Sequence, residues 1–275
     1  MSTQELRESR LVIEGGIAEF SHQRPATRNV MSMELRADYK DMLTRVENDP
    51  SIRVLIITGS GGSFCAGGDV KAMLARQAGG DPSGQSVAQV ARTRLQGDHR
   101  GWLDRLRSLE VPVIAAVDGP AFGAGVSLCL MSDFTLASSR ASFCVVFAKI
   151  GAVPDFGSLY TLPRVVGLAK AKELMMTARR FGPQEAQSLG IVHAIHEPEA
   201  LLEEARKLAA RLAQGPREAL GMIKSSLNRS FDVDYQTMGE IEAHQQALAM
   251  SMPFHADAVA RFARREPLAY DWDRP

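Results

Sequence analysis

The 275-residue sequence lacks several features that define particular classes of protein. Its only cysteines, Cys65, Cys129 and Cys144, include no Cys-x-x-Cys pair, which argues against a disulfide framework or a zinc site. Lysine plus arginine equals aspartate plus glutamate at 32 each, so no net charge indicates nucleic-acid binding. No segment approaches the roughly 20 apolar residues of a membrane span, and residues 1–10 show no signal-peptide pattern. We therefore expect a cytoplasmic protein that binds neither nucleic acid nor membrane.

Glycine-rich turns, in contrast, are prominent, and one of them lies in residues 111–127. The apolar run 113–117 ends at Asp118-Gly119-Pro120, which predicts a buried strand followed by a tight turn. Gly123-Ala124-Gly125 then removes bulk where an apolar segment can begin a helix. Unpaired N–H groups at a helix N-terminus favour negative charge, so this turn is a candidate anion site. The alternative is a buried corner whose glycines only allow close packing.

A second stretch of the same kind occupies residues 53–69. The β-branched run 53–58 predicts a strand, and it leads into the most glycine-dense part of the sequence, 59–69. This loop has neither the Gly-Lys-Ser/Thr ending of a P-loop nor the Gly-x-Gly-x-x-Gly spacing of a dinucleotide fold. We interpret it as a turn whose backbone amides face some other ligand.

Asp155 is the candidate acid/base residue. It lies in Ala152-Val153-Pro154-Asp155-Phe156-Gly157, where apolar side chains enclose the carboxylate. Burial disfavours the charged form, so we expect an elevated pKa suited to proton transfer. The alternatives are an aspartate in a surface turn or a helix N-cap.

The remaining pattern predicts an α/β chain that becomes all-helical near residue 200. We expect a hairpin at 11–20, a helix from Ser32 to about Asn48, and a strand at 191–195. Residues 76–90 are rich in glycine, serine and glutamine, which predicts either a mobile excursion beside a ligand site or a disordered loop without a function. A helix is expected further along, at about 101–109.

Two segments resemble the enoyl-CoA hydratase/isomerase (crotonase) superfamily. They are Ser-Phe-Cys-Ala-Gly-Gly-Asp at 63–69 and Pro-Val-Ile-Ala-Ala-Val-Asp-Gly-Pro-Ala-Phe-Gly-Ala-Gly at 112–125, and the spacing of the motifs between 151 and 192 is similar too. The resemblance implies a crotonase-like spiral of ββα repeats with the acyl-CoA site in 1–199. It implies a C-terminal all-helical trimerisation region in 200–275, which closes the pocket and builds a homotrimer or a dimer of trimers.

The resemblance also implies an acyl-CoA thioester substrate, no metal, and no cofactor apart from the coenzyme A of that substrate. The two backbone N–H donors of the family's oxyanion hole carry over to Cys65 and Ala124. Asp69 is expected to order its loop rather than to catalyse. The implied substrate and CoA contacts are Arg24, Ala26, Arg28, Gly67, Gly68, Asp69, Gly123 and Phe147.

The departures from the family pattern bear on the reaction. Hydratases of the family use two glutamates, and those positions hold Ser127 and Phe147 here, neither of which is a general base. Asp155 lies where the single-aspartate isomerase branch, including the ring-epoxide isomerases of phenylacetyl-CoA catabolism, places its acid/base. Three hypotheses follow: an isomerase in which Asp155 shuttles a proton, a hydratase in which Asp155 alone activates water, and a non-catalytic acyl-CoA-binding subunit.

Overall fold

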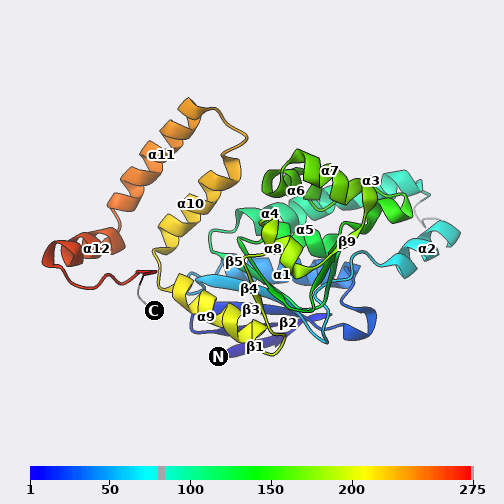
Figure 1. Cartoon of the computed structure of the whole chain (residues 1–275), viewed down its shortest axis with the longest axis horizontal. Helices are drawn as coiled ribbons and strands as arrows, with labels where there is room; N and C mark the ends of the chain where they lie inside the picture. Colours follow the sequence, from blue (N-terminus) through cyan, green and yellow to red (C-terminus); the bar gives the residue numbers. More distant parts are fainter. Residues whose placement is uncertain (80–83, 274–275) are drawn as a thin grey trace.

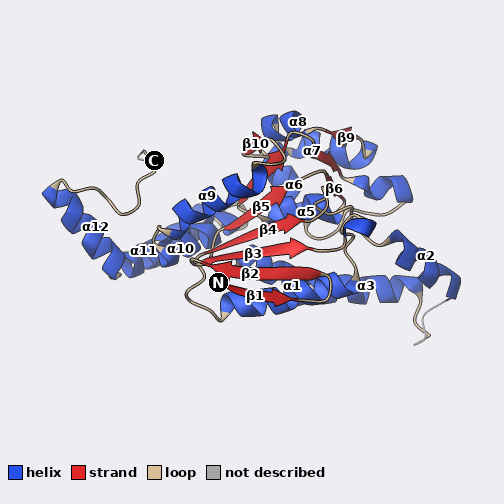
Figure 2. Ribbon diagram, turned by 90° about the horizontal axis from the view of Figure 1, so that it is seen from below, coloured by secondary structure: helices blue, strands red, loops and turns tan. Residues whose placement is uncertain are grey.

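The chain builds two β-sheets with helices on both faces of the larger one (Figures 1 and 2). The computed structural model describes residues 1–79 and 84–273. The strands are β1 (Ser2–Glu5), β2 (Ser9–Glu14), β3 (Ile17–His22), β4 (Val54–Gly59), β5 (Val113–Val117), β6 (Pro120–Phe122), β7 (Phe134–Ser138), β8 (Ser142–Cys144), β9 (Arg180–Phe181) and β10 (Ala194–His196). The larger sheet has the order β1-β2-β3-β4-β5-β7-β10 and the smaller one β6-β8-β9.

The larger sheet is antiparallel at one edge and parallel from β3 onward. β2 and β3 form the expected hairpin, in which Glu14 is paired with Ile17. β3, β4, β5, β7 and β10 are then paired in parallel. Parallel strands that are covered on both faces have apolar residues at nearly every position. The apolar run 113–117 fits this description, because every one of its residues is buried. The carboxyl ends of β4 and β5 therefore lie at the same edge of the sheet.

Helices cover the sheet and extend beyond it. The α-helices are α1 (Met33–Glu47), α2 (Val70–Gly79), α3 (Val87–Asp98), α4 (Asp104–Ser108), α5 (Ala124–Met131), α6 (Ser158–Val166), α7 (Leu168–Thr177), α8 (Pro183–Ser188), α9 (Leu201–Ala213), α10 (Arg217–Arg229), α11 (Tyr235–Met250) and α12 (Pro253–Arg264). Short 3₁₀ turns lie at Pro25–Thr27 and Val146–Ile150, and a π-helical turn at His99–Leu103 joins α3 to α4. As predicted, the side chain of Ser32 caps α1 by accepting the Leu35 N–H.

The two faces of the sheet carry separate cores. On β4, Leu55 and Ile57 belong to the main core, while Val54 and Ile56 pack with the apolar stripe of α9. Helix α9 is thus part of the sheet layers, whereas α10 to α12 extend away from them as an arm, residues 217–264 (Figure 1). The change to an all-helical chain near residue 200 is confirmed, but packing places the start of the projecting region after α9.

The segment between β4 and β5 is more helical than the sequence analysis predicted. Helix α2 extends to Gly79 and α3 begins at Val87, so an irregular excursion over all of 76–90 is wrong. The signal that was missed is a capping box: Ser86 accepts the N–H of Gln89, whose side chain accepts the Ser86 N–H. Residues 80–83 of the predicted excursion lie outside the described residues. The predicted strand at 191–195 begins later, at Ala194.

Candidate active site

The two glycine-rich turns lie against each other at the carboxyl edge of the parallel strands. Cys65 forms a β-bridge with Ala121, and the Phe122 N–H donates to the Cys65 carbonyl at 2.9 Å. A Cβ atom on Gly67 would lie 3.9 Å from the Cα of Gly123. The two stretches that the sequence analysis identified separately therefore form one site.

The N-terminus of α5 provides a free backbone donor at this contact. Its N-cap, Gly123, has φ +50°, a conformation that favours glycine. Helix α5 starts at Ala124, whose N–H has no hydrogen-bond acceptor within the described ranges 1–79 and 84–273. Gly125 allows the close approach of the other turn, because a Cβ there would lie 2.4 Å from the Cys65 carbonyl oxygen. This geometry is compatible with the predicted donor role of Ala124, which stays a prediction.

The predicted donor role of Cys65 is wrong. The Cys65 N–H donates to the Pro120 carbonyl at 3.1 Å, because residues 65 and 121 pair as a β-bridge that closes the turn. The Cys65 side chain is buried, and burial raises its thiol pKa to about 11. Three residues further along, the N–H of Gly68 has no acceptor in the described part of the chain. Of these two residues, Gly68 and not Cys65 therefore has an N–H group that is free to donate, although the sequence predicted only a substrate contact for Gly68.

Asp155 is held beside helix α5 by its own backbone. Its carbonyl oxygen accepts the Ser127 hydroxyl at 3.1 Å, the Ser158 hydroxyl at 2.8 Å and the Ser158 N–H at 3.1 Å. Ser127 lies one helical turn after Ala124, so the same short helix carries the free amide and fixes the Asp155 loop. The next residue, Phe156, is buried with φ +50°, an unusual conformation for a bulky side chain.

The Asp155 carboxyl has the electrostatic character that the sequence predicted. It is half-buried, and burial raises its pKa to about 6 from an ordinary value of 3.8. Its side chain is not a helix N-cap, because Gly157 occupies that position of α6. A carboxyl with this pKa is present in both protonation states near neutral pH, as a proton shuttle requires.

The residues assigned to coenzyme A lie around the same turns. Arg24, Ala26 and Arg28 are exposed on the turn that includes Pro25–Thr27. The Arg28 carbonyl accepts the Ala66 N–H at 3.0 Å, so this turn is attached to the glycine-rich loop. These positions are compatible with the predicted contacts, which stay a prediction.

Three further predicted contact residues have identifiable structural roles. Asp69 accepts the Ala72 N–H at 3.0 Å, as expected of a residue that orders the start of α2. The Gly67 carbonyl accepts the Met31 N–H at 2.8 Å. The ring of Phe147 is buried, and its Cζ atom would lie 3.5 Å from a Cβ on Gly123. Phe147 therefore packs against the turn that presents the Ala124 amide.

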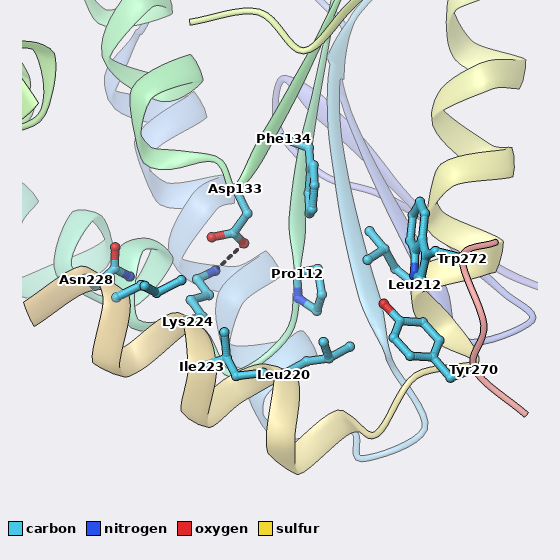
Figure 3. A pocket seen from close by; sticks show the side chains of 11 residues that line it. Pro112, Asp133, Phe134, Leu212, Leu220, Ile223, Lys224, Asn228, Tyr270 and Trp272 are labelled. Carbon is cyan, nitrogen blue, oxygen red and sulfur yellow. Dashed lines mark ion pairs between the residues drawn. The ribbon is translucent and has the colours of Figure 1, made fainter. Parts of the chain in front are cut away.

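A separate cavity of about 430 Å³ lies at the opposite edge of the sheet (Figure 3). Pro112 precedes β5 and Phe134 begins β7, so the cavity is at the amino ends of these strands. Apolar side chains of α9, α10 and the C-terminal segment line it, and Lys224 forms an ion pair with Asp133 at 2.8 Å. The cavity is therefore not the site that contains Ala124 and Asp155.

Two classes of feature are missing from the described part of the chain. No group of three or more histidine, cysteine, aspartate or glutamate side chains is placed there to hold a metal ion. None of its helices combines the length and the apolar character needed to cross a membrane.

Comparisons with known proteins identify the family. The family model for enoyl-CoA hydratase/isomerase matches residues 12–270. The chain is 33% identical to a 1,2-epoxyphenylacetyl-CoA isomerase from Escherichia coli K12, with 93% of this chain and 95% of the relative covered. It is also 33% identical to a crotonyl-CoA hydratase from Syntrophomonas wolfei, with 88% of this chain and 89% of that protein covered. A crystal structure of an enoyl-CoA hydratase/isomerase from Cupriavidus metallidurans CH34 superposes with a TM-score of 0.89 at 39% identity, covering 97% of each chain. The chain belongs to the enoyl-CoA hydratase/isomerase family.

Proposed function

We propose that this enzyme is an acyl-CoA isomerase in which Asp155 moves a proton between two carbon atoms of the acyl group. The observation that carries the proposal is the half-buried Asp155 carboxyl, with its pKa raised to about 6, on a residue whose backbone carbonyl is hydrogen-bonded to the helix that presents the free Ala124 amide. Ser127 and Phe147 occupy the positions at which hydratases carry glutamates, so Asp155 is the acid/base residue of the proposed reaction.

The proposed reaction is a balanced proton transfer. The ionised Asp155 takes a proton from a carbon atom of the acyl chain, and the electron pair left behind moves onto the thioester oxygen to give an enolate. The N–H groups of Ala124 and Gly68 donate hydrogen bonds to that oxygen. The protonated Asp155 then returns the proton to a different carbon, and the enolate collapses with the double bond or ring rearranged.

The two amides stabilise the enolate more than the neutral thioester, because the oxygen gains negative charge during the reaction. Oxyanion donors of this kind contribute on the order of 3 kcal/mol each to transition-state stabilisation. Backbone donors are already oriented, so little reorganisation is needed as the charge develops. The reaction as written consumes no co-reactant, and we propose no metal or redox cofactor.

Substitution of Asp155→Asn tests the proposal. We expect turnover to be abolished while binding of CoA esters is retained, because the amide is close in shape to the carboxyl and cannot accept a proton at neutral pH. Solvent deuterium exchange into a β,γ-unsaturated acyl-CoA, followed by mass spectrometry, measures the proton transfer directly. A fully active Asp155→Asn variant contradicts the proposal, and CoA-ester binding by the wild-type enzyme without exchange into any ester favours the non-catalytic subunit.

A hydratase is the second candidate, because relatives such as the crotonyl-CoA hydratase are named for that reaction. In this case Asp155 alone activates water for addition to a 2-enoyl-CoA. Incubation with crotonyl-CoA, in parallel with a β,γ-unsaturated ester, separates the two functions. Rapid loss of the conjugated double bond of crotonyl-CoA without migration of the β,γ double bond supports the hydratase.

We also propose that the protein assembles as a homotrimer or a dimer of trimers in the cytoplasm. Support comes from the arm, residues 217–264, which exposes large apolar side chains. They include Ile223, Leu227, Phe231, Leu248, Met250, Val259 and Phe262. Exposed apolar surface of this extent is typical of protein interfaces. Sedimentation velocity should give the mass of three or six 29.9 kDa chains, and a monomer contradicts the assembly.

A further inference from the structure

Arg36 is a buried cation that the proposed reaction does not use directly. It lies on α1, and its side chain is only 12% exposed. Its guanidinium forms an ion pair with Asp98, the last residue of α3, whose side chain is 5% exposed. The indole N–H of Trp102 donates to the other carboxylate oxygen of Asp98 at 3.0 Å. The pair therefore has a defined orientation inside the protein.

Phe156 connects this pair to the active-site aspartate. The Arg36 guanidinium carbon lies 5.1 Å from the centroid of the Phe156 ring. The Trp102 ring packs edge-on against the same ring, with centroids 5.2 Å apart and an interplanar angle of 88°. Phe156 directly follows Asp155 and holds a left-handed backbone conformation. The ion pair and the Asp155 backbone thus share one buried aromatic residue.

The ion pair with Asp98 does not use every N–H donor of the Arg36 guanidinium. Its Nε atom is buried and has no hydrogen-bond partner in the described ranges of the chain. Burial of an ion pair contributes little net stability, because desolvation offsets most of the attraction between the charges. Burial of an unpaired donor adds a further cost. A gain in protein stability therefore does not explain why the Arg36 guanidinium is buried at this position.

We propose that Arg36 and Asp98 are positioning residues that set the protonation state of Asp155, with Arg36 favouring its ionised form and Asp98 favouring its protonated form. The proposal rests on the proposed function, in which Asp155 must both take up and release a proton. Neither residue needs to contact the substrate, because both act through the field at the Asp155 carboxyl.

The charges around Asp155 agree with this arrangement. Burial raises the pKa of Asp155, Arg36 on α1 lowers it, Asp98 on α3 raises it, and His99 at the start of the π-helical turn lowers it. Burial lowers the pKa of Arg36 itself, while Asp98 raises it and the neighbouring Arg94 lowers it. The two members of the ion pair thus shift the pKa of the Asp155 carboxyl in opposite directions. Their combined effect keeps this pKa near the range in which a proton shuttle operates.

Two substitutions with opposite expected effects test the proposal. In protein labelled with ¹³C at the aspartate carboxyl, the Asp155 resonance is identified by its loss in Asp155→Asn, and its titration is followed by NMR. Arg36→Gln should raise the pKa of Asp155 and Asp98→Asn should lower it, each changing the ionisation constant by about tenfold or more. Arg36→Lys, which keeps the charge, should shift the titration less than Arg36→Gln.

Arg45→Gln is the matched control, because Arg45 lies on the same helix with a half-exposed side chain paired with Asp49, and its removal should leave the Asp155 titration unchanged. Circular dichroism establishes that each variant is folded; if Arg36→Gln does not fold, Asp98→Asn still tests the proposal, because its titration must move to lower pH. Shifts in the same direction, or no shift in either Arg36→Gln or Asp98→Asn, overturn the proposal. The pH profile of turnover should move with the titration. A titration that shifts as expected in an enzyme without isomerase activity supports the ion pair's role while contradicting the proposed function.

Discussion

The hydroxyl of Ser127 donates to the backbone carbonyl of Asp155 at 3.1 Å. Ser127 belongs to α5, the helix whose first residue, Ala124, presents a free N–H group at the candidate site. Ser127 is therefore a structural link between the proposed oxyanion donor and the proposed acid/base residue.

Ser127→Ala should reduce turnover more than it reduces stability. The Asp155 carbonyl keeps its two hydrogen bonds from Ser158, so we expect a loss of only about 1 kcal/mol in the free energy of unfolding. A less firmly held Asp155 should slow the reaction by about tenfold, because proton transfer depends on alignment. Urea denaturation and steady-state kinetics measure the two effects. Ser132→Ala is the control, since Ser132 donates to Leu128 of the same helix region; an equal kinetic loss in both variants contradicts the linking role.

Asp155→Asn should stabilise the protein at alkaline pH. Because burial raises the folded-state pKa from 3.8 to about 6, the stability that the protonated carboxyl contributes is present below pH 3.8 and is lost as pH rises through 6. The ionised carboxyl therefore costs stability above that range, and its removal should raise the free energy of unfolding by about 1 to 3 kcal/mol near pH 8. Urea denaturation at several pH values measures the difference, which should shrink towards pH 4. A variant that is less stable than wild type near pH 8 contradicts the desolvation of Asp155.

Gly125→Ala should disrupt the contact between the two glycine-rich turns. The added Cβ would lie 2.4 Å from the Cys65 carbonyl oxygen, so the backbones must separate. We expect a loss of about 1 to 3 kcal/mol in stability together with a large loss of turnover, because the free amides move apart. In the matched control Gly239→Ala, the added Cβ meets no atom within 4 Å, and this exposed helical position should gain up to about 1 kcal/mol. Calorimetry and kinetics on both variants make the comparison, and retention of wild-type activity in Gly125→Ala contradicts the predicted separation.

His22 should make the protein sensitive to mild acid. It is fully buried, with Nδ1 2.9 Å from the Phe64 carbonyl and Nε2 2.9 Å from the Tyr39 hydroxyl. Burial lowers its pKa from 6.5 to about 4, so the stability of the neutral form is present above pH 6.5 and is lost as pH falls towards 4. The loss should be about 3 kcal/mol.

Urea denaturation of wild type and His22→Asn at closely spaced pH values tests the assignment. The variant should be less stable near pH 7 but should lack this part of the pH dependence, because its side chain does not titrate. If both proteins lose stability equally between pH 6.5 and 4, the acid sensitivity belongs to other groups.

The sequence predicted local structure well where the signal was local. The hairpin before β4, the helix capped by Ser32 and the buried run 113–117 each follow from periodicity, turn residues and capping within a few positions. Helix α3 also had a local signal, the Ser86 and Gln89 capping box, which was not recognised among the surrounding glycines.

The assignment of Cys65 shows where reasoning from sequence reached its limit. In an irregular loop, the motif at 63–69 does not reveal which of several adjacent amides is free. The Cys65 N–H is not free because Cys65 forms a bridge with Ala121, a residue far away in the chain. The N–H of Gly68, which lies outside this bridge, has no acceptor in the described part of the chain.

By itself, the sequence determined the glycine-rich turns after two apolar strands, the position of Asp155 among apolar residues along the chain and the absence of glutamates at positions 127 and 147, because these depend on residue type and near neighbours. The tertiary structure decided which amides are free, how Ser127 holds the backbone of Asp155, and that Arg36, paired with Asp98, packs against Phe156, the residue next to Asp155. These properties depend on hydrogen bonds and ion pairs between segments that are distant in the sequence and that only tertiary packing brings together.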